Sequence, residues 1–559
     1  MIIKSFIAAF LIFFVLYYTL KNKAITIPFF ETGKATKFIT LLGILFLIFF
    51  YLIPVSYYFP YNNGVLGDNY VHLERALNQP GFIKHHHPLF PLISEKFLSV
   101  LISIKLLSIN DPMFLEQAFY WSVFPISLGL SLSLILFSFI LFKKNLSNLI
   151  WACILVLMAT SYGVWLWAIQ SNAIGLAIAT ELVVVSLFMI WYKSKKLGWL
   201  SLLAFFVGLS VFVHNGLIYL AMGSFLSVIW VLFRDRANNK RVLVQVVFFS
   251  VILFIMAAFY YLLQAKINNT YNLVQLFHTL SDSNYFGSFG SGEILGAMEG
   301  NFWAGINWLI GFYYTSAPSI WSTENVKISI PFAGEWFKAI QTGAVFTLLM
   351  VISIDSFKRR LHPSKDLLIF GLINSVVFFA GFTMRQAGSH YYVLALIPNL
   401  ILLIAFIIGK KEKKSNLIYV IPIVIIIAGN VYFNSFTELS IFKGRNIDDH
   451  PYYKINASIL KITEGKDAAY FGKMDLHYYP NMELVAYYKT KFSTITWVTE
   501  WSDEEDLEKR IAKNQLKGEE IFVSKEAYEI LDREKTESRK VADNLYLIKD
   551  KSIHKFPEP

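Results

Sequence analysis

Long apolar segments recur along the first 434 residues, and they constrain the fold more than any other feature of the sequence. A helix of about 20 apolar residues crosses the ~30 Å hydrocarbon core of a bilayer. By this criterion we predict about twelve transmembrane helices, and hence an all-α polytopic membrane domain. The expected spans are residues 5–20, 38–59, 118–142, 149–167, 173–192, 197–213, 216–233, 242–263, 339–354, 367–384, 391–408 and 417–433.

The composition excludes an ordinary soluble protein. Apolar residues make up 55% of the chain and charged residues 16%, against about 25% charged residues in soluble domains. The net charge is +11, yet 22 of the 39 acidic residues follow residue 440. The basic surplus therefore belongs to the membrane part, where it reflects topology, and we expect no nucleic-acid partner.

Lysine and arginine gather in every second connection between the predicted spans, which sets the orientation by the positive-inside rule. These connections contain Lys21, Lys23, Lys34 and Lys37; Lys143 and Lys144; Lys193, Lys195 and Lys196; Arg234, Arg236, Lys240 and Arg241; Lys358, Arg359, Arg360 and Lys365; and Lys410, Lys411, Lys413 and Lys414. We therefore predict a multi-pass protein of the plasma or inner membrane. Its outer loops are expected at residues 60–117 and 264–338, with everything after residue 434 outside the cytoplasm.

The last part of the chain, residues 435–559, has the alternating pattern of a small α/β domain. We predict strands at residues 468–472, 494–499, 521–524 and 545–548, and helices at 475–488, 503–513 and 525–533, with Ser502 and Asp503 as helix caps. The membrane domain is accordingly expected to span residues 1–434.

Metal and redox chemistry find little support in the sequence. Cys153 is the single cysteine, so neither a disulfide nor a thiolate metal cluster is expected. His85, His86 and His87 offer imidazoles that suit zinc or copper, but three consecutive side chains do not easily converge on one ion. A divalent metal stays open as a cofactor; packing at the membrane surface and substrate contact are the other readings of this histidine run.

The first outer loop contains a polar pattern that favours a function. Residues 67–70 read Gly-Asp-Asn-Tyr, and about twenty residues later positions 87–91 read His-Pro-Leu-Phe-Pro. On a helix that begins at Asp68, His72 lies one turn further along the same face. Asp68 thus has a hydrogen-bonding neighbour at the expected rim of the membrane, although it also suits a simple N-cap.

These two motifs resemble the signature of the GT-C glycosyltransferases, above all their protein O-mannosyltransferase and aminoarabinose-transferase branches. A later stretch, residues 385–398, resembles the Arg/Tyr-to-Pro element near the end of such membrane domains. The chain departs from the pattern where Asn69 replaces a second acid and where the motif reads His-Pro-Leu-Phe in place of His-Pro-Pro-Leu.

The resemblance implies an inverting enzyme that transfers a hexose or pentose from a polyprenyl phosphate to an acceptor hydroxyl, with Asp68 as the catalytic base. The acceptor is a protein, a lipid or a glycan, and membrane lipids surround the enzyme. Arg385 suits the leaving phosphate because a guanidinium binds phosphate through two parallel hydrogen bonds. The further substrate-binding candidates are His72, Glu74, Lys84, His86, His87, His214 and His390.

Two other classes of protein fit the predicted spans. A lipid-linked-glycan polymerase, ligase or flippase shares large outer loops, but such loops are expected to be richer in arginine. A transporter places charges in the middle of the membrane. Glu181 is the one acidic residue well inside a predicted span, where it is either functional or a helix-packing residue.

Overall fold

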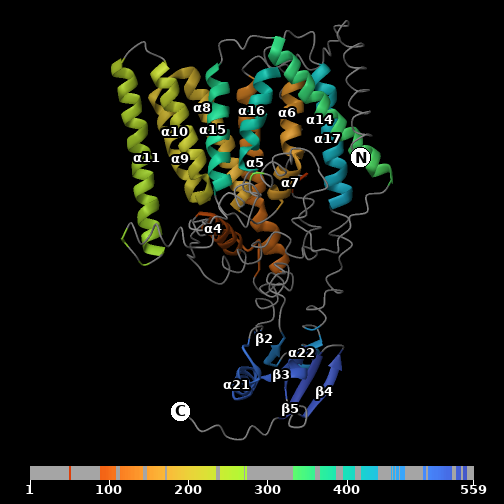
Figure 1. Ribbon diagram of the computed structural model, residues 1–559. Coiled ribbons are helices and arrows are strands. Elements are labelled where there is room, and N and C mark those ends of the chain that lie inside the picture. Colours follow the sequence, from red (N-terminus) through yellow and green to blue (C-terminus); the bar gives the residue numbers. More distant parts are fainter. Residues whose placement is uncertain are drawn as a thin grey trace, which may run out of the picture. The chain divides into compact units, whose positions relative to one another are not determined.

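The computed structural model contains a set of helices and a C-terminal sheet (Figure 1). The described residues are 50–51, 89–108, 114–142, 148–169, 173–234, 239–267, 269, 271–272, 302, 332–358, 365–384, 394–408, 417–438, 455, 458–459, 461–464, 466–472, 495–498, 501–531, 537–542 and 545–550. The chain divides into two compact units. The first comprises Met1–Ser56, Gly81–Ile104 and Tyr120–Ser440, and the second comprises Tyr57–Pro80, Lys105–Phe119 and Ile441–Pro559. The predicted boundary between residues 434 and 435 stays a prediction.

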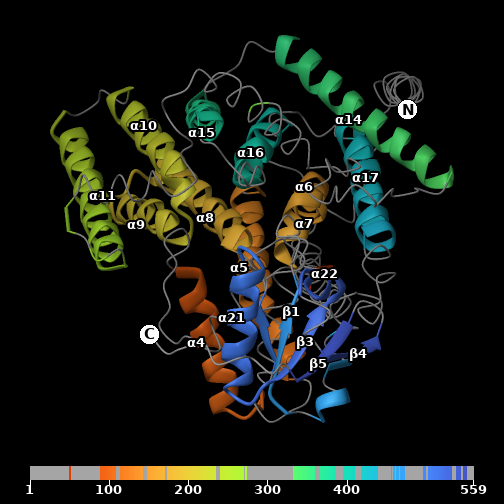
Figure 2. The ribbon, with the colours of Figure 1, turned by 60° about the horizontal axis from the view of Figure 1, so that its bottom comes forward.

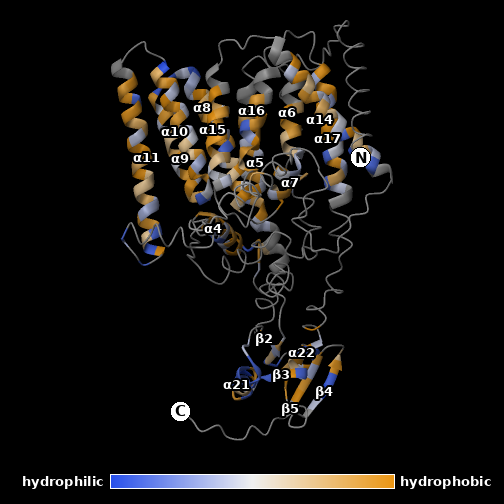
Figure 3. Ribbon diagram, in the orientation of Figure 1, coloured by the Kyte–Doolittle hydropathy of each residue, from blue (hydrophilic) through white to orange (hydrophobic). Residues whose placement is uncertain are grey.

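The first unit is built of helices in which apolar residues dominate (Figure 3). They are α4 (Leu89–Ser103), α5 (Phe114–Phe142), α6 (Asn148–Thr160), α7 (Tyr162–Ala168), α8 (Ala173–Ser194), α9 (Leu197–Val213), η2 (Asn215–Leu217), α10 (Ile218–Arg234), α11 (Asn239–Ile267), α14 (Phe332–Lys358), α15 (Lys365–Met384), α16 (Ile397–Ile408), α17 (Leu417–Tyr432) and the π-helix η6 (Phe433–Glu438).

Within the part of the chain that the structure describes, five helices are long and apolar enough to cross a membrane. They lie at Ala173–Ser194, Asn215–Arg234, Val242–Ile267, Glu335–Ile354 and Leu417–Ser435. Each predicted span from residue 118 onward overlaps a helix. The predicted spans at residues 5–20 and 38–59 lie almost entirely outside the described residues, so the total of about twelve spans stays a prediction.

Helix α11 illustrates which solvent these helices face. It packs against α9, yet Leu243, Val247 and Phe254 are 63%, 52% and 75% exposed. A helix so apolar and so exposed suits hydrocarbon rather than water.

The span predicted at residues 149–167 is not one helix but two, because the helix breaks at Ser161. Carbonyl groups at the end of α6 accept hydrogen bonds from distant side chains. Tyr51 Oη donates to the Ala159 carbonyl and Asn434 Nδ2 to the Thr160 carbonyl, both at 3.0 Å. A break at membrane depth is tolerated where side chains supply such partners.

Helices α10 and α15 approach each other closely through small and polar residues. Ser224 Oγ donates to Asn374 Oδ1 at 3.0 Å, and Asn374 Nδ2 donates to the carbonyl of Phe370, also at 3.0 Å. Gly223 faces Asn374, where a Cβ would meet its side chain at 2.8 Å. This is the small-residue packing that membrane helices use.

Gly381 gives a test of this packing. A Cβ at position 381 would lie 2.2 Å from the ring of Tyr219, so Gly381→Ala forces the helices apart. We expect a loss of about 1–3 kcal/mol in unfolding free energy, seen as a lower melting temperature in detergent. Gly198→Ala is the control, because nothing lies within 4 Å of a Cβ there. Equal melting temperatures for the two variants would contradict the close approach of α10 and α15.

The second unit contains a five-stranded sheet in the order β2-β1-β3-β5-β4. Its strands are β1 (Ala468–Phe471), β2 (Ile495–Val498), β3 (Glu520–Ser524), β4 (Glu537–Ala542) and β5 (Leu545–Asp550), and its helices are α21 (Glu504–Gln515) and α22 (Lys525–Ile530). Strands β1, β2 and β3 run parallel, whereas β5 is antiparallel to both β3 and β4. Figure 2 turns this sheet toward the viewer.

Alternating side chains give the sheet two apolar faces. One face packs Phe471 and Val523 with residues of α21 and α22, including Leu507 and Ala527. The opposite face contains Tyr470, Ile495, Phe522 and Leu545, with Ile459 packed against them. Four of the five strands and the helices α21 and α22 agree with the prediction. Of the two predicted caps, Asp503 is the N-cap of α21 and accepts from the Asp506 N–H at 2.9 Å, whereas Ser502 precedes it.

Strand β4 was not predicted, because its sequence Glu-Ser-Arg-Lys-Val-Ala carries the charges that protect an edge strand and lacks apolar alternation. The helix predicted at residues 475–488 lies outside the described residues.

Candidate functional site

The second motif of the first predicted outer loop, residues 87–91, leads into a helix. Helix α4 begins at Leu89, directly after His87 and Pro88, and Phe90 is fully buried against Ile126 of α5 and Ala173 of α8. Phe97 stacks on Phe124 of α5 with ring centroids 5.9 Å apart. Phe90 of the motif therefore packs α4 on the parts of α5 and α8 that are predicted to lie toward the extracytoplasmic side.

Most of the predicted site residues lie outside the described residues, so their positions stay predictions. This holds for the catalytic candidate and for all binding candidates except one: Asp68, His72, Glu74, Lys84, His86, His87, Arg385 and His390.

His214 is the described candidate, and it is 2% exposed between α9 and α10. Its Nδ1 accepts a hydrogen bond from the Gly216 N–H at 2.9 Å. Because that nitrogen acts as an acceptor, the proton of the neutral ring resides on Nε2. The buried imidazole therefore acts through an Nε2–H donor, which suits a polar anchor inside the protein better than an exposed anchor in the lipid interface.

The buried face of α4 carries two polar residues that the sequence analysis did not single out. Ser94 and Glu95 lie in the stripe formed by Phe90, Leu98 and Leu101. Glu95 is 5% exposed, although it also pairs with Lys96 at 2.9 Å, whose side chain is 73% exposed. A carboxylate inside an apolar stripe, two turns after His87, is a candidate contact for sugar hydroxyls. The sequence contains the sign of this burial, because Ser94 and Glu95 fall at the three-to-four-residue spacing that places them on one helix face with Phe90, Leu98 and Leu101.

A second polar group that the sequence analysis missed lies between α14 and α17. Gln341 Nε2 donates to Asn430 Oδ1 at 2.8 Å and to the Ile426 carbonyl at 3.2 Å. One turn before Gln341, Lys338 is 3% exposed. Lys338 is thus a buried cation near the end of α14 that is predicted to face outward, where a lipid phosphate is expected. The hydropathy pattern predicts a loop at Lys338, because the apolar span begins at residue 339.

Glu181 of α8 is fully buried and bonded to Asn399 of α16, with Nδ2 donating to Oε1 at 2.6 Å. It contacts a neutral amide and no described cation. This environment favours a role in helix packing over a transport site.

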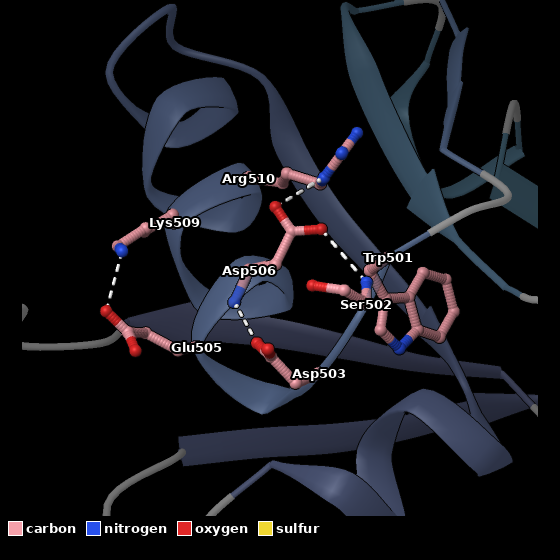
Figure 4. Close-up of a pocket in the computed structure, with 7 residues that line it drawn as sticks. All are labelled: Trp501, Ser502, Asp503, Glu505, Asp506, Lys509 and Arg510. Carbon is pink, nitrogen blue, oxygen red and sulfur yellow. Dashed lines mark hydrogen bonds and ion pairs between the residues drawn. The ribbon is translucent and has the colours of Figure 1, made fainter.

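The second unit has an open hollow of about 630 Å³ beside α21 (Figure 4). Its two cationic side chains are already paired. Lys509 lies 2.6 Å from Glu505, and Arg510 Nε lies 2.9 Å from Asp506. The hydrogen bond from Arg510, followed by that from the Ser502 N–H, holds the pKa of Asp506 below its usual range. These pairs stabilise the first turns of α21. Both cations of the hollow are therefore engaged by carboxylates of α21 itself and not by a ligand.

A divalent metal as a cofactor stays a hypothesis. Among the described residues no group of three His, Cys, Asp or Glu side chains could hold an ion, and His85, His86 and His87 lie outside those residues.

These features define a membrane fold of packed apolar helices, with a small α/β domain later in the chain. Structures of ArnT from Cupriavidus metallidurans are similar over nearly the whole length of both chains. The structure bound to undecaprenyl phosphate is 10% identical with a TM-score of 0.51, and covers 91% of this chain and 97% of ArnT. The apo structure is 11% identical with a TM-score of 0.52, and covers 92% and 98%.

No protein-family model and no curated protein matches the sequence. The likeness to the two ArnT structures confirms the predicted resemblance to the aminoarabinose-transferase branch at the level of the fold.

Proposed function

We propose that this protein is a membrane glycosyltransferase that moves a sugar from a polyprenyl phosphate to an acceptor hydroxyl on the extracytoplasmic face. The observation that carries the proposal is the likeness to ArnT over 91% of the chain, in a structure that holds undecaprenyl phosphate. The sugar is a hexose or pentose, and the acceptor is a protein, lipid or glycan. Transfer by direct attack would invert the anomeric carbon.

The location of the predicted site gives a chemical reason for such a donor. Nucleotide sugars are made inside the cell, so chemistry on the outer face needs a sugar that is activated within the membrane. A polyprenyl phosphate supplies both the membrane anchor and the leaving group. Transfer then requires a base for the acceptor proton and cations for the departing phosphate.

Asp68 is proposed as the base and Arg385 as the main phosphate ligand. His72, Glu74, Lys84, His86, His87, His214 and His390 are proposed to bind the donor or the acceptor. Lys338 and Glu95 join this group because both are buried. Lys338 lies near the end of α14 that is predicted to face outward, and Glu95 lies midway along α4, within the first predicted outer loop.

The direct test is a donor assay with purified protein in lipid nanodiscs. Synthetic polyprenyl phosphates carrying different hexoses or pentoses are supplied with a membrane extract as acceptor, and free polyprenyl phosphate is measured by mass spectrometry. We expect one donor class to be consumed. Folded protein that neither binds polyprenyl phosphate nor consumes any of these donors would contradict the proposal.

The proposed face of the membrane is tested by cysteine labelling. In a Cys153→Ala background, Ser538→Cys is expected to react with an impermeant thiol reagent in intact cells. Lys196→Cys, in a connection predicted to be cytoplasmic, is the matched control and should react only after lysis. The reverse pattern would move the second unit and every proposed outer-loop residue to the cytoplasm.

A further inference from the structure

The contact between Glu181 and Asn399 joins two helices in the membrane unit. Asn399 Nδ2 donates to Glu181 Oε1 at 2.6 Å, and both side chains are fully buried. Asn399 lies in the first turn of α16, whereas Glu181 lies eight residues after the start of α8, about 12 Å along that helix. The contact therefore holds the beginning of α16 at the level of the third turn of α8.

Each partner retains one oxygen that this hydrogen bond does not use. Glu181 Oε2 and Asn399 Oδ1 are both buried, and neither has a hydrogen-bond partner among the residues that the structure describes. If Glu181 is ionised, both of these atoms are acceptors, and the one hydrogen bond between the side chains satisfies neither. Such an arrangement costs free energy in a medium without water.

The surroundings offer no described charge to offset an ionised carboxylate. Helices α7, α9 and α16 all contact α8 and contain no charged residue. Helices α5 and α15 also contact α8, through Ile126 and Phe370. Their charged residues lie ten residues before Ile126 (Glu116) and four to five residues before Phe370 (Lys365 and Asp366). On α8 itself the nearest cation is Lys193, twelve residues and about 18 Å further along the helix. An ion at this depth is expensive unless it is paired.

We propose that Glu181 is a neutral carboxylic acid and forms a two-point acid–amide pair with Asn399. The proton on Oε2 is then donated to Asn399 Oδ1, while Oε1 accepts from Nδ2, so each of the four polar atoms has a partner. The pair fixes α16 against α8. Because the described residues 394–396 lead directly into α16, Glu181 and Asn399 act as positioning residues for this part of the chain, and an effect on sugar transfer rests on the proposed function.

The substitution Glu181→Gln separates the neutral acid from an ionised one. A glutamine amide reproduces both hydrogen bonds to Asn399, so we expect a melting temperature within about 2 °C of wild type. Glu181→Leu and Asn399→Leu remove the pair, and each is expected to lower the melting temperature by at least about 3 °C. Ser186→Ala is the control, since Ser186 is likewise buried on α8 and its hydroxyl has no partner within the described ranges; it should melt like wild type.

Infrared difference spectroscopy measures the proton itself. The wild-type spectrum minus the Glu181→Gln spectrum at pH 7 should contain the C=O stretch of one protonated carboxyl group, and Asn399→Leu should shift that band. A carboxylate band in its place, or a Glu181→Gln variant that melts several degrees lower, would overturn the proposal. Neither measurement needs a substrate, so this result is independent of whether the protein transfers sugar.

The rate of sugar transfer by the same variants tests the positioning role. Glu181→Gln should transfer sugar like wild type, whereas Asn399→Leu should lower transfer at least about 10-fold below the Ser186→Ala control at equal amounts of folded protein. Equal transfer by Asn399→Leu and Ser186→Ala would refute the positioning role. A wild-type protein without transfer activity would instead count against the proposed function.

Discussion

Asp68→Asn is expected to lower sugar transfer at least about 100-fold, because it removes the carboxylate that is proposed to take the proton of the acceptor hydroxyl. Asparagine has nearly the same size and caps a helix as well as aspartate does, so folding should survive. The measurement is the initial rate of polyprenyl phosphate release by purified variants of equal melting temperature.

Asp111→Asn provides the matched control. Asp111 lies in the same predicted outer loop but outside the Gly-Asp-Asn-Tyr motif, and the substitution changes the charge equally. We expect it to transfer sugar like wild type. Full activity of a folded Asp68→Asn variant would leave Asp68 as a helix cap only, and the base would have to be sought elsewhere, first at Glu95.

The sequence predicted the helices well because a bilayer imposes a simple rule on a chain. A run of apolar residues bounded by lysines is enough to locate α9, whose bounds agree with the prediction at residues 197–213. The break at Ser161 obeys a different rule. It depends on Tyr51 and Asn434, which are 108 and 274 residues away from their carbonyl partners and leave no mark on the local pattern.

The candidate site was only partly predictable for a related reason. Motif resemblance found residues of the first outer loop, but it says nothing about which side chains of the following helix face inward. Glu95 was overlooked because its burial depends on how Phe90 and Phe97 pack on α5. Lys338 was assigned to a loop because hydropathy placed the start of the span at residue 339, whereas α14 begins at Phe332.

Hydrogen-bonded pairs across helices were also beyond the reach of sequence analysis. Glu181 stood out as an acidic residue in a span, but its partner Asn399 is 218 residues away and lies on a helix of unremarkable polarity. Without that partner, an acidic residue that takes part in function cannot be distinguished from one that only joins helices. The neutral amide opposite Glu181 is what favours packing.

Substitution of Arg385 is expected to lower the rate of sugar transfer in two steps. Arg385→Lys keeps the positive charge but loses the two-pronged hydrogen bond to phosphate, and Arg385→Met loses both. By analogy with other preorganised donors to a developing negative charge, complete removal should cost about 10²- to 10³-fold in rate, with lysine between the two. Transfer is measured at saturating donor and at equal amounts of folded protein.

Binding of polyprenyl phosphate without sugar identifies the cause of that loss, because this lipid presents the leaving group alone. Arg385→Met should weaken its binding, whereas Arg360→Met, in a connection predicted to be cytoplasmic, should not. If Arg385 were only an interfacial anchor, its aliphatic stem would matter more than its charge, and lysine would replace it fully. Equal affinity of wild type and Arg385→Met would remove Arg385 from the phosphate site, and the buried Lys338 would become the first cation to test in its place.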